Sequence, residues 1–133
     1  MKMRRLLSCI MALLLIISLP VSALADEYDL AQGSVTISAS ESGQTVTHKE
    51  ETRPDSAPVI TQSGGGTTAN TVTIEAGAGS TANVTLDGVN ISADVAAIQT
   101  SGSGDVVIEL DGENTVQSGE GHAGVEKDNS GSL

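Results

Sequence analysis

The sequence feature that most limits the possible folds is an internal repeat between residues 83 and 133. Leu86-Asp87-Gly88 recurs as Leu110-Asp111-Gly112, 24 positions later. Three residues are also matched at an interval of 27 positions: Ile98, Gly104 and Val106 by Val125, Gly131 and Leu133. A unit of this length, made of short β-prone runs and glycine turns, is typical of a solenoid. The repeat predicts an all-β chain that forms a right-handed parallel β-helix, incomplete, with about two coils.

Short runs of β-branched residues predict strands, and no helix is expected after residue 25. Such runs begin at Val72, Val84, Val89 and Val106. Asp-Gly pairs between alternating runs are also a hairpin signal, so an antiparallel meander is the structural alternative. An antiparallel meander does not require the sequence pattern to repeat after 24 or 27 residues, so the repeat favours the β-helix.

The chain divides into three parts by composition. Residues 1–25 are interpreted as a signal peptide, because a basic start precedes an apolar run and the small-residue ending Ala23-Leu24-Ala25. Residues 26–68 are expected to form an irregular acidic flank and linker with short strands, since prolines and three consecutive glycines interrupt the pattern. Residues 69–133 are expected to be the β-helix repeat region, truncated at the C-terminus of what we interpret as a fragment of a longer protein.

The charge of the chain excludes several classes of partner. Residues 1–25 hold three of the six basic residues and none of the 17 acidic ones, so residues 26–133 carry 3 − 17 = −14. Such a charge disfavours nucleic acid and anionic membrane as partners, and no membrane association is expected after signal cleavage. The single cysteine, Cys9, lies in the signal peptide, which leaves the exported chain without a disulfide.

Asp87 and Asp111 are the candidate metal ligands, because they occupy equivalent places in the repeat. In a parallel β-helix they would stack about 4.8 Å apart. Two carboxylates at that distance repel each other unless a cation lies between them, and Ca²⁺ favours oxygen ligands. The alternative is that both Asp-Gly pairs are only turn residues with hydrated carboxylates. Asn90 and Asn114 also repeat after 24 positions and predict a stacked amide ladder.

No residue pattern indicates catalysis. The histidines, His48 and His122, have neither cysteines nor a second histidine nearby, which disfavours zinc. No nucleophile elbow surrounds any serine. We therefore expect no enzyme activity and assign no catalytic residue.

Ala69 to Leu133 resembles the repeat region of secreted bacterial β-helix proteins described as carbohydrate-binding-domain proteins, whose fold is similar to that of pectate lyases. The matching blocks are Val84 to Ile91, Ala96 to Ile98, Val107 to Val116 and Gly121 to Val125. The resemblance implies extracellular or cell-surface carbohydrate binding, often with calcium. It implies no established catalysis.

The expected function is non-catalytic binding of a polysaccharide by a secreted protein, held at the cell surface if a missing C-terminal region anchors it. An acidic glycan that needs Ca²⁺ is favoured over a crystalline neutral one, because the only aromatic residue, Tyr28, lies outside the repeat. The ligand-binding residues are not identified. The alternatives are a structural stalk or adhesin segment, with possible edge-to-edge self-association, and a fragment of a polysaccharide lyase. A lyase needs a basic residue, and Lys49 and Arg53 lie outside the repeat.

Overall fold

The computed structural model describes residues 26–133, so the predicted signal peptide lies outside the described residues. The described chain is all-β, as the sequence predicts, with one short 3-10 helix, η1. The elements are β1 (Glu27–Asp29), η1 (Leu30–Gln32), β2 (Val35–Ser40), β3 (Gly43–His48), β4 (Glu51–Pro54), β5 (Val59–Thr61), β6 (Val72–Ala76), β7 (Thr81–Asp87), β8 (Asn90–Ser92), β9 (Ile98–Gly102), β10 (Asp105–Asp111), β11 (Thr115–Gln117) and β12 (Val125–Lys127).

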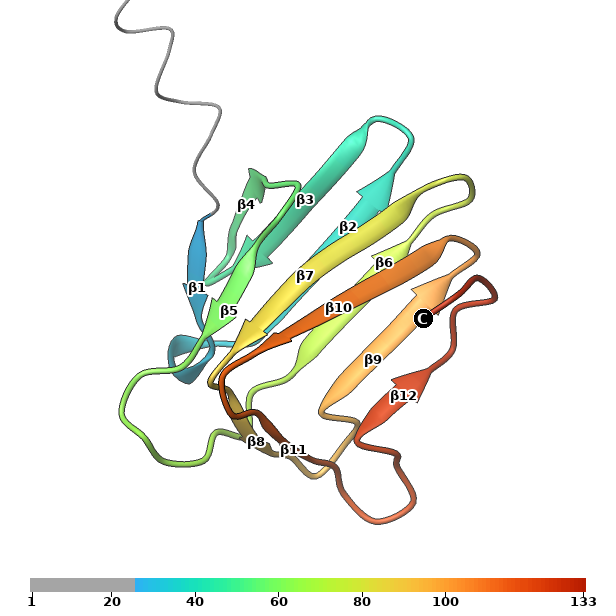
Figure 1. Ribbon diagram of the computed structural model, residues 1–133. Coiled ribbons are helices and arrows are strands. Elements are labelled where there is room, and N and C mark those ends of the chain that lie inside the picture. The colour runs from blue at the N-terminus through green and yellow to red at the C-terminus, as the bar shows by residue number, and fades with distance from the viewer. Residues whose placement is uncertain (1–25) are drawn as a thin grey trace, which may run out of the picture.

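The strands form three sheets (Figure 1). The four-stranded sheet has the order β1-β5-β7-β10 and is parallel throughout. The six-stranded sheet has the order β12-β9-β6-β2-β3-β4; it is parallel from β12 to β2, whereas β3 is antiparallel to both of its neighbours. The parallel pair β11-β8 forms the two-stranded sheet. In the repeat region, successive strands of the chain therefore alternate between sheets instead of forming a meander.

The strand register confirms the repeat spacings read from the sequence. Asp111 of β10 lies beside Asp87 of β7, which is its counterpart in the Leu-Asp-Gly repeat. Val125 of β12 lies beside Ile98 of β9, and these two residues begin the longer of the two repeats. Because the side chains of a strand alternate between its two faces, these registers place apolar residues over apolar residues on the inner face.

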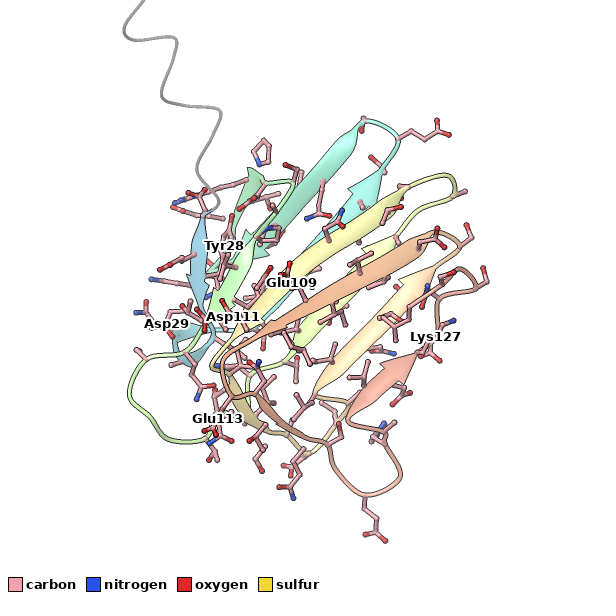
Figure 2. The ribbon with its side chains drawn as sticks, viewed as in Figure 1. Tyr28, Asp29, Glu109, Asp111, Glu113 and Lys127 are labelled. Atoms are coloured by element: carbon pink, nitrogen blue, oxygen red, sulfur yellow. The ribbon has the colours of Figure 1, made fainter. Side chains whose placement is uncertain are left out.

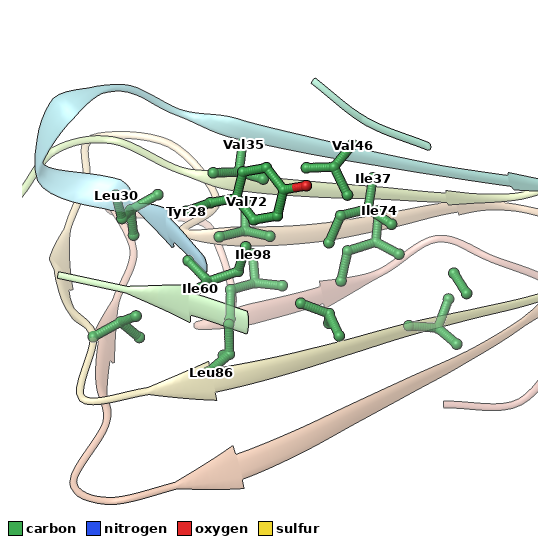
Figure 3. Close-up of a cluster of buried hydrophobic side chains, with 14 of the residues drawn as sticks. Tyr28, Leu30, Val35, Ile37, Val46, Ile60, Val72, Ile74, Leu86 and Ile98 are labelled. Carbon is green, nitrogen blue, oxygen red and sulfur yellow. The ribbon is translucent and has the colours of Figure 1, made fainter. Parts of the chain in front are cut away.

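The hydrophobic core lies between the four-stranded and six-stranded sheets (Figure 3). Ile37 of β2, Ile60 of β5 and Leu86 of β7 all project into it and are almost fully buried. Tyr28 of β1 belongs to the same cluster. The stretch expected as an irregular flank and linker with short strands supplies five strands, β1 to β5, and part of the core.

Three glycines at equal intervals in the sequence, Gly77, Gly104 and Gly131, stack on one another at one corner of the fold. A β-carbon on Gly104 would overlap the carbonyl oxygen of Gly77, and one on Gly131 would overlap that of Gly104. The backbone turns can stack this closely only because the positions lack side chains.

The stacked strands of the two larger sheets end differently at the N-terminal and C-terminal ends of the fold. At the N-terminal end, β3 and β4 extend the six-stranded sheet, and β4 carries Pro54 and two charges, features that protect a sheet edge from further pairing. At the C-terminal end the apolar interior is exposed. Leu110 is 67% exposed although its register partner Leu86 is 1% exposed. A groove of about 340 Å³ opens there, lined by Leu86, Ile98, Ile108, Leu110, Asn114, Val116, Val125 and Leu133.

Candidate binding cleft

A polar cleft of about 320 Å³ lies at the N-terminal end of the stack, where β1, η1, β3 and β4 meet. We call it the N-terminal cleft. Its lining residues are Glu27, Tyr28, Asp29, Gln32, His48, Lys49, Glu51 and Arg53. Its volume is at the lower end of the range for small-ligand sites.

Tyr28 and His48 form the aromatic wall of the cleft. Their rings meet edge to face, with centroids 5.9 Å apart. The His48 Nε2 atom lies 3.0 Å from the Asp29 carbonyl oxygen. The Tyr28 hydroxyl donates to Asp55 Oδ2 over 3.0 Å. Burial, and then this hydrogen bond, raise the pKa of Tyr28 to about 12, so its hydroxyl remains a proton donor near neutral pH.

Asp29 fixes the floor of the cleft through four hydrogen bonds. Its carboxylate accepts from the Ser63 hydroxyl over 2.6 Å, from the Ser63 and Ala31 backbone N–H groups over 3.0 Å each, and from the Gln32 amide over 3.4 Å. The hydroxyl of Ser63 is the main reason why the pKa of Asp29 is lowered. Asp29 is therefore an ionised acceptor, and its hydrogen bonds from Ser63 join β1 to the loop after β5.

The turn between β3 and β4 carries Lys49 into the cleft. Lys49 and Glu50 have φ angles of 55° and 65°. Two consecutive positive φ angles match a type I′ hairpin turn, which usually contains Asn or Gly. Side chains longer than Asn are strained in this region, at about 1 kcal/mol or more each. The Lys49 ammonium group donates to Gln32 Oε1 over 2.9 Å.

Arg53 is the second cation of the cleft. Its Nη2 atom lies 2.8 Å from Glu51 Oε2, and both side chains are more than half exposed. The third cation of residues 26–133, Lys127, is on β12 and far from Tyr28 and Asp29 (Figure 2). Two of the three cations therefore line a single cleft. Sequence reasoning misses this arrangement, because Lys49 and Arg53 lie in a stretch that its prolines and charges mark as a linker.

The predicted metal ligands, Asp87 and Asp111, are register neighbours on β7 and β10, and both are exposed. Adjacent strands place them about 4.8 Å apart, and Glu109 shares their outer face because it is two residues before Asp111. Within residues 26–133, no group of three or more His, Cys, Asp or Glu residues is arranged to hold a metal ion. The two aspartates would thus supply only part of a Ca²⁺ coordination sphere, which needs six to eight oxygen ligands.

The predicted ladder between Asn90 and Asn114 is wrong. In the two-stranded sheet Asn90 lies beside Thr115 and not beside Asn114, so the register differs by one position from that of the four-stranded sheet. Asn114 instead accepts from the Val89 backbone N–H over 2.9 Å and donates to the Leu86 carbonyl over 3.2 Å. It satisfies backbone groups at the bend between β7 and β8.

Comparison of the chain with protein-family models, curated proteins and solved structures finds no match. Residues 26–133 also contain no helix with the length and apolar character needed to cross a membrane. The resemblance to carbohydrate-binding β-helix proteins stays a prediction.

Proposed function

We propose that this protein is a secreted or cell-surface polysaccharide-binding module without catalytic activity, built on a short right-handed parallel β-helix. The N-terminal cleft is the observation that carries the binding function. It is a concave polar site in which carboxylate, amide, imidazole, ammonium and guanidinium groups converge. Sugar hydroxyls donate and accept hydrogen bonds, and these side chains offer both capacities.

The β-helix part of the proposal is supported by the path of the chain. It passes through β7, β8 and β9, one in each sheet, and then through β10, β11 and β12 in the same order. Each strand of the second set lies parallel to its counterpart in the first. Crossover connections between parallel strands are right-handed in about 98% of cases, which supports the right-handed form.

Asp87 and Asp111 are the proposed ligands for a Ca²⁺ ion that would bridge the protein and an acidic glycan. An acidic glycan would be repelled by a chain whose residues 26–133 carry 3 − 17 = −14, and a divalent cation between the two sets of carboxylates would remove that repulsion. When bound, Ca²⁺ would supply positive charge and oxygen coordination. The stacked aspartates would orient it on the outer face of β7 and β10.

A structural stalk is the second candidate function, favoured by the open C-terminal end. Leu110, Val125 and Leu133 are exposed beside unpaired strand edges, which are suited to further strand pairing. If the protein is a stalk, the stacked strands serve only to span a distance from the cell surface, and the cleft binds no ligand.

Titration calorimetry of the full chain with polygalacturonate and with a neutral glucan, with and without chelator, tests the proposed function. We expect polygalacturonate to bind. If calcium bridging contributes, chelator and the double substitution Asp87→Asn/Asp111→Asn should weaken binding together, whereas the exposed control Glu75→Gln should not. Binding that survives both changes would exclude bridging through these aspartates. No binding to either glycan would favour the stalk.

A further inference from the structure

We propose that the N-terminal cleft holds the carboxylate of an acidic sugar directly, between Lys49 and Arg53, with no metal ion between protein and ligand. This inference rests on the proposed polysaccharide-binding function and identifies the chemical group that its cleft recognises. It also assigns the recognition to the β1 end of the four-stranded sheet and not to the Asp87–Asp111 pair on β7 and β10.

Lys49 has no acidic partner within residues 26–133. Residues 26–133 contain 17 carboxylate side chains and only three cations, so a lysine would be expected to find a carboxylate easily. Lys49 instead contacts the neutral amide of Gln32. No carboxylate oxygen within residues 26–133 lies within 4.0 Å of its ammonium group. An ammonium group carries three donors, so Lys49 retains donors for a ligand.

Two of the carboxylates that line the cleft are already engaged by groups of the protein. Asp29 is an acceptor for Ser63, Ala31 and Gln32, and Glu51 pairs with Arg53. These contacts occupy two of the three acids in the lining and leave Glu27 as the third. Arg53 carries five N–H donors and uses one on Glu51. Its remaining donors match the two oxygens of a ligand carboxylate.

The backbone that carries the two cations is preorganised. Lys49 lies in a turn whose two central residues both adopt positive φ, and such strained positions cluster at functional sites. Arg53 follows on β4, which pairs with β3 over residues 51 to 54. A short hairpin thus fixes the backbone positions from which both side chains extend, so only their side-chain rotamers remain to be ordered when a ligand binds.

The long-range charge of the protein does not prevent such a contact. At physiological ionic strength, interactions between exposed charges are largely screened beyond about 8 Å. A carboxylate inside the cleft therefore responds mainly to the charges of the lining itself, in which Lys49 and Arg53 attract it and the three acids Glu27, Asp29 and Glu51 repel it. The affinity should be modest and should fall as salt concentration rises.

The test uses the full chain and a trimer of galacturonate as probe. Every variant is measured with chelator, and the wild-type protein is measured with and without it. We expect Lys49→Ala and Arg53→Gln each to weaken binding by about tenfold, as expected for loss of a charged hydrogen bond. Lys127→Ala is the matched control, because its ammonium group lies on β12 and donates to the Asn129 carbonyl. Circular dichroism of each variant shows whether the fold is kept, and weaker binding counts only for a folded variant.

The outcomes separate this inference from the proposed function. A glycan that binds the wild-type protein and both cleft variants equally would overturn the inference and leave the proposed function standing. Binding that disappears with chelator would overturn it too, in favour of calcium. If no glycan binds, both fail. Monomeric galacturonate and acetate distinguish the source of the carboxylate: a sugar site should bind galacturonate more tightly than acetate, and equal binding would reject sugar recognition.

Discussion

Leu86 and Leu110 offer a direct test of the open C-terminal end, because they are the same residue at equivalent places in successive repeats. They lie side by side in the register of β7 and β10. Leu86 is 1% exposed and Leu110 is 67% exposed. We predict that Leu86→Ala destabilises the protein far more than Leu110→Ala.

The magnitudes follow from burial. Replacing a fully buried leucine by alanine removes its transfer free energy and leaves a cavity, which together amount to about 3–5 kcal/mol. Leu110 retains about one third of its possible burial, and full burial of a leucine is worth about 1.5–3 kcal/mol, so its loss should stay below about 1 kcal/mol. The difference between the variants should therefore be at least about 2 kcal/mol.

Urea unfolding followed by far-ultraviolet circular dichroism measures this difference. With a urea dependence of about 1–3 kcal/mol per molar, a loss of about 2 kcal/mol lowers the midpoint by about 1 M. Equal destabilisation by the two substitutions would refute the reasoning, because Leu110 would then be covered in solution. Repeating the measurement at several protein concentrations would show whether a second copy covers it, since association makes the midpoint depend on concentration.

Two further predictions concern the glycine stack and the tyrosine. Gly104→Ala should destabilise the fold by several kcal/mol, because the added β-carbon would overlap the Gly77 carbonyl oxygen. Gly66→Ala is the control: its β-carbon would meet nothing within 4 Å, so its urea unfolding midpoint should change little. Equal urea midpoints for the two variants would contradict the glycine stacking. The chain has a single tyrosine, so tyrosinate absorbance should titrate near pH 12 when folded and near pH 10 in urea. Because the pKa of Tyr28 is higher in the folded state than in the unfolded state, its contribution to the free energy of unfolding is fully present below pH 10 and is lost as pH rises toward 12. A tyrosinate transition near pH 10 in the folded protein would show that Tyr28 is not buried against Asp55.

The parts of the fold that are predictable from sequence are those in which local pattern and register agree. The Leu-Asp-Gly repeat identifies β7 and β10 as neighbours, and the structure pairs Asp87 with Asp111 as expected. Alternation over residues 34–38 and 44–47, with Gly43 as the turn, also predicts β2 and a return strand β3, and the structure pairs the two strands antiparallel. The Asn90–Asn114 ladder fails because equal spacing in sequence does not guarantee equal register in a different sheet.

The cleft is not predictable, because its residues carry no shared local pattern. Its acids and cations come from β1, η1 and the β3–β4 hairpin, segments that meet only when the sheets form. The turn at Lys49-Glu50 lacks the Asn-Gly signal of a tight hairpin. Tyr28 lies in an acidic segment that looks like a flexible start, although the fold buries it beside His48.

The side chain of Gln44 on β3 covers part of the edge of β7 that faces the N-terminal end of the fold. Its amide donates to the Asn83 carbonyl over 2.9 Å, and its Oε1 accepts from the Asn83 N–H over 2.8 Å. A single side chain thus makes the two hydrogen bonds that a neighbouring strand would make with β7 at this point. At the opposite end, β10 keeps an unpaired edge beside exposed leucine. The Gln44 side chain therefore closes β7 to strand pairing at Asn83, whereas the edge of β10 still offers backbone groups to a further strand.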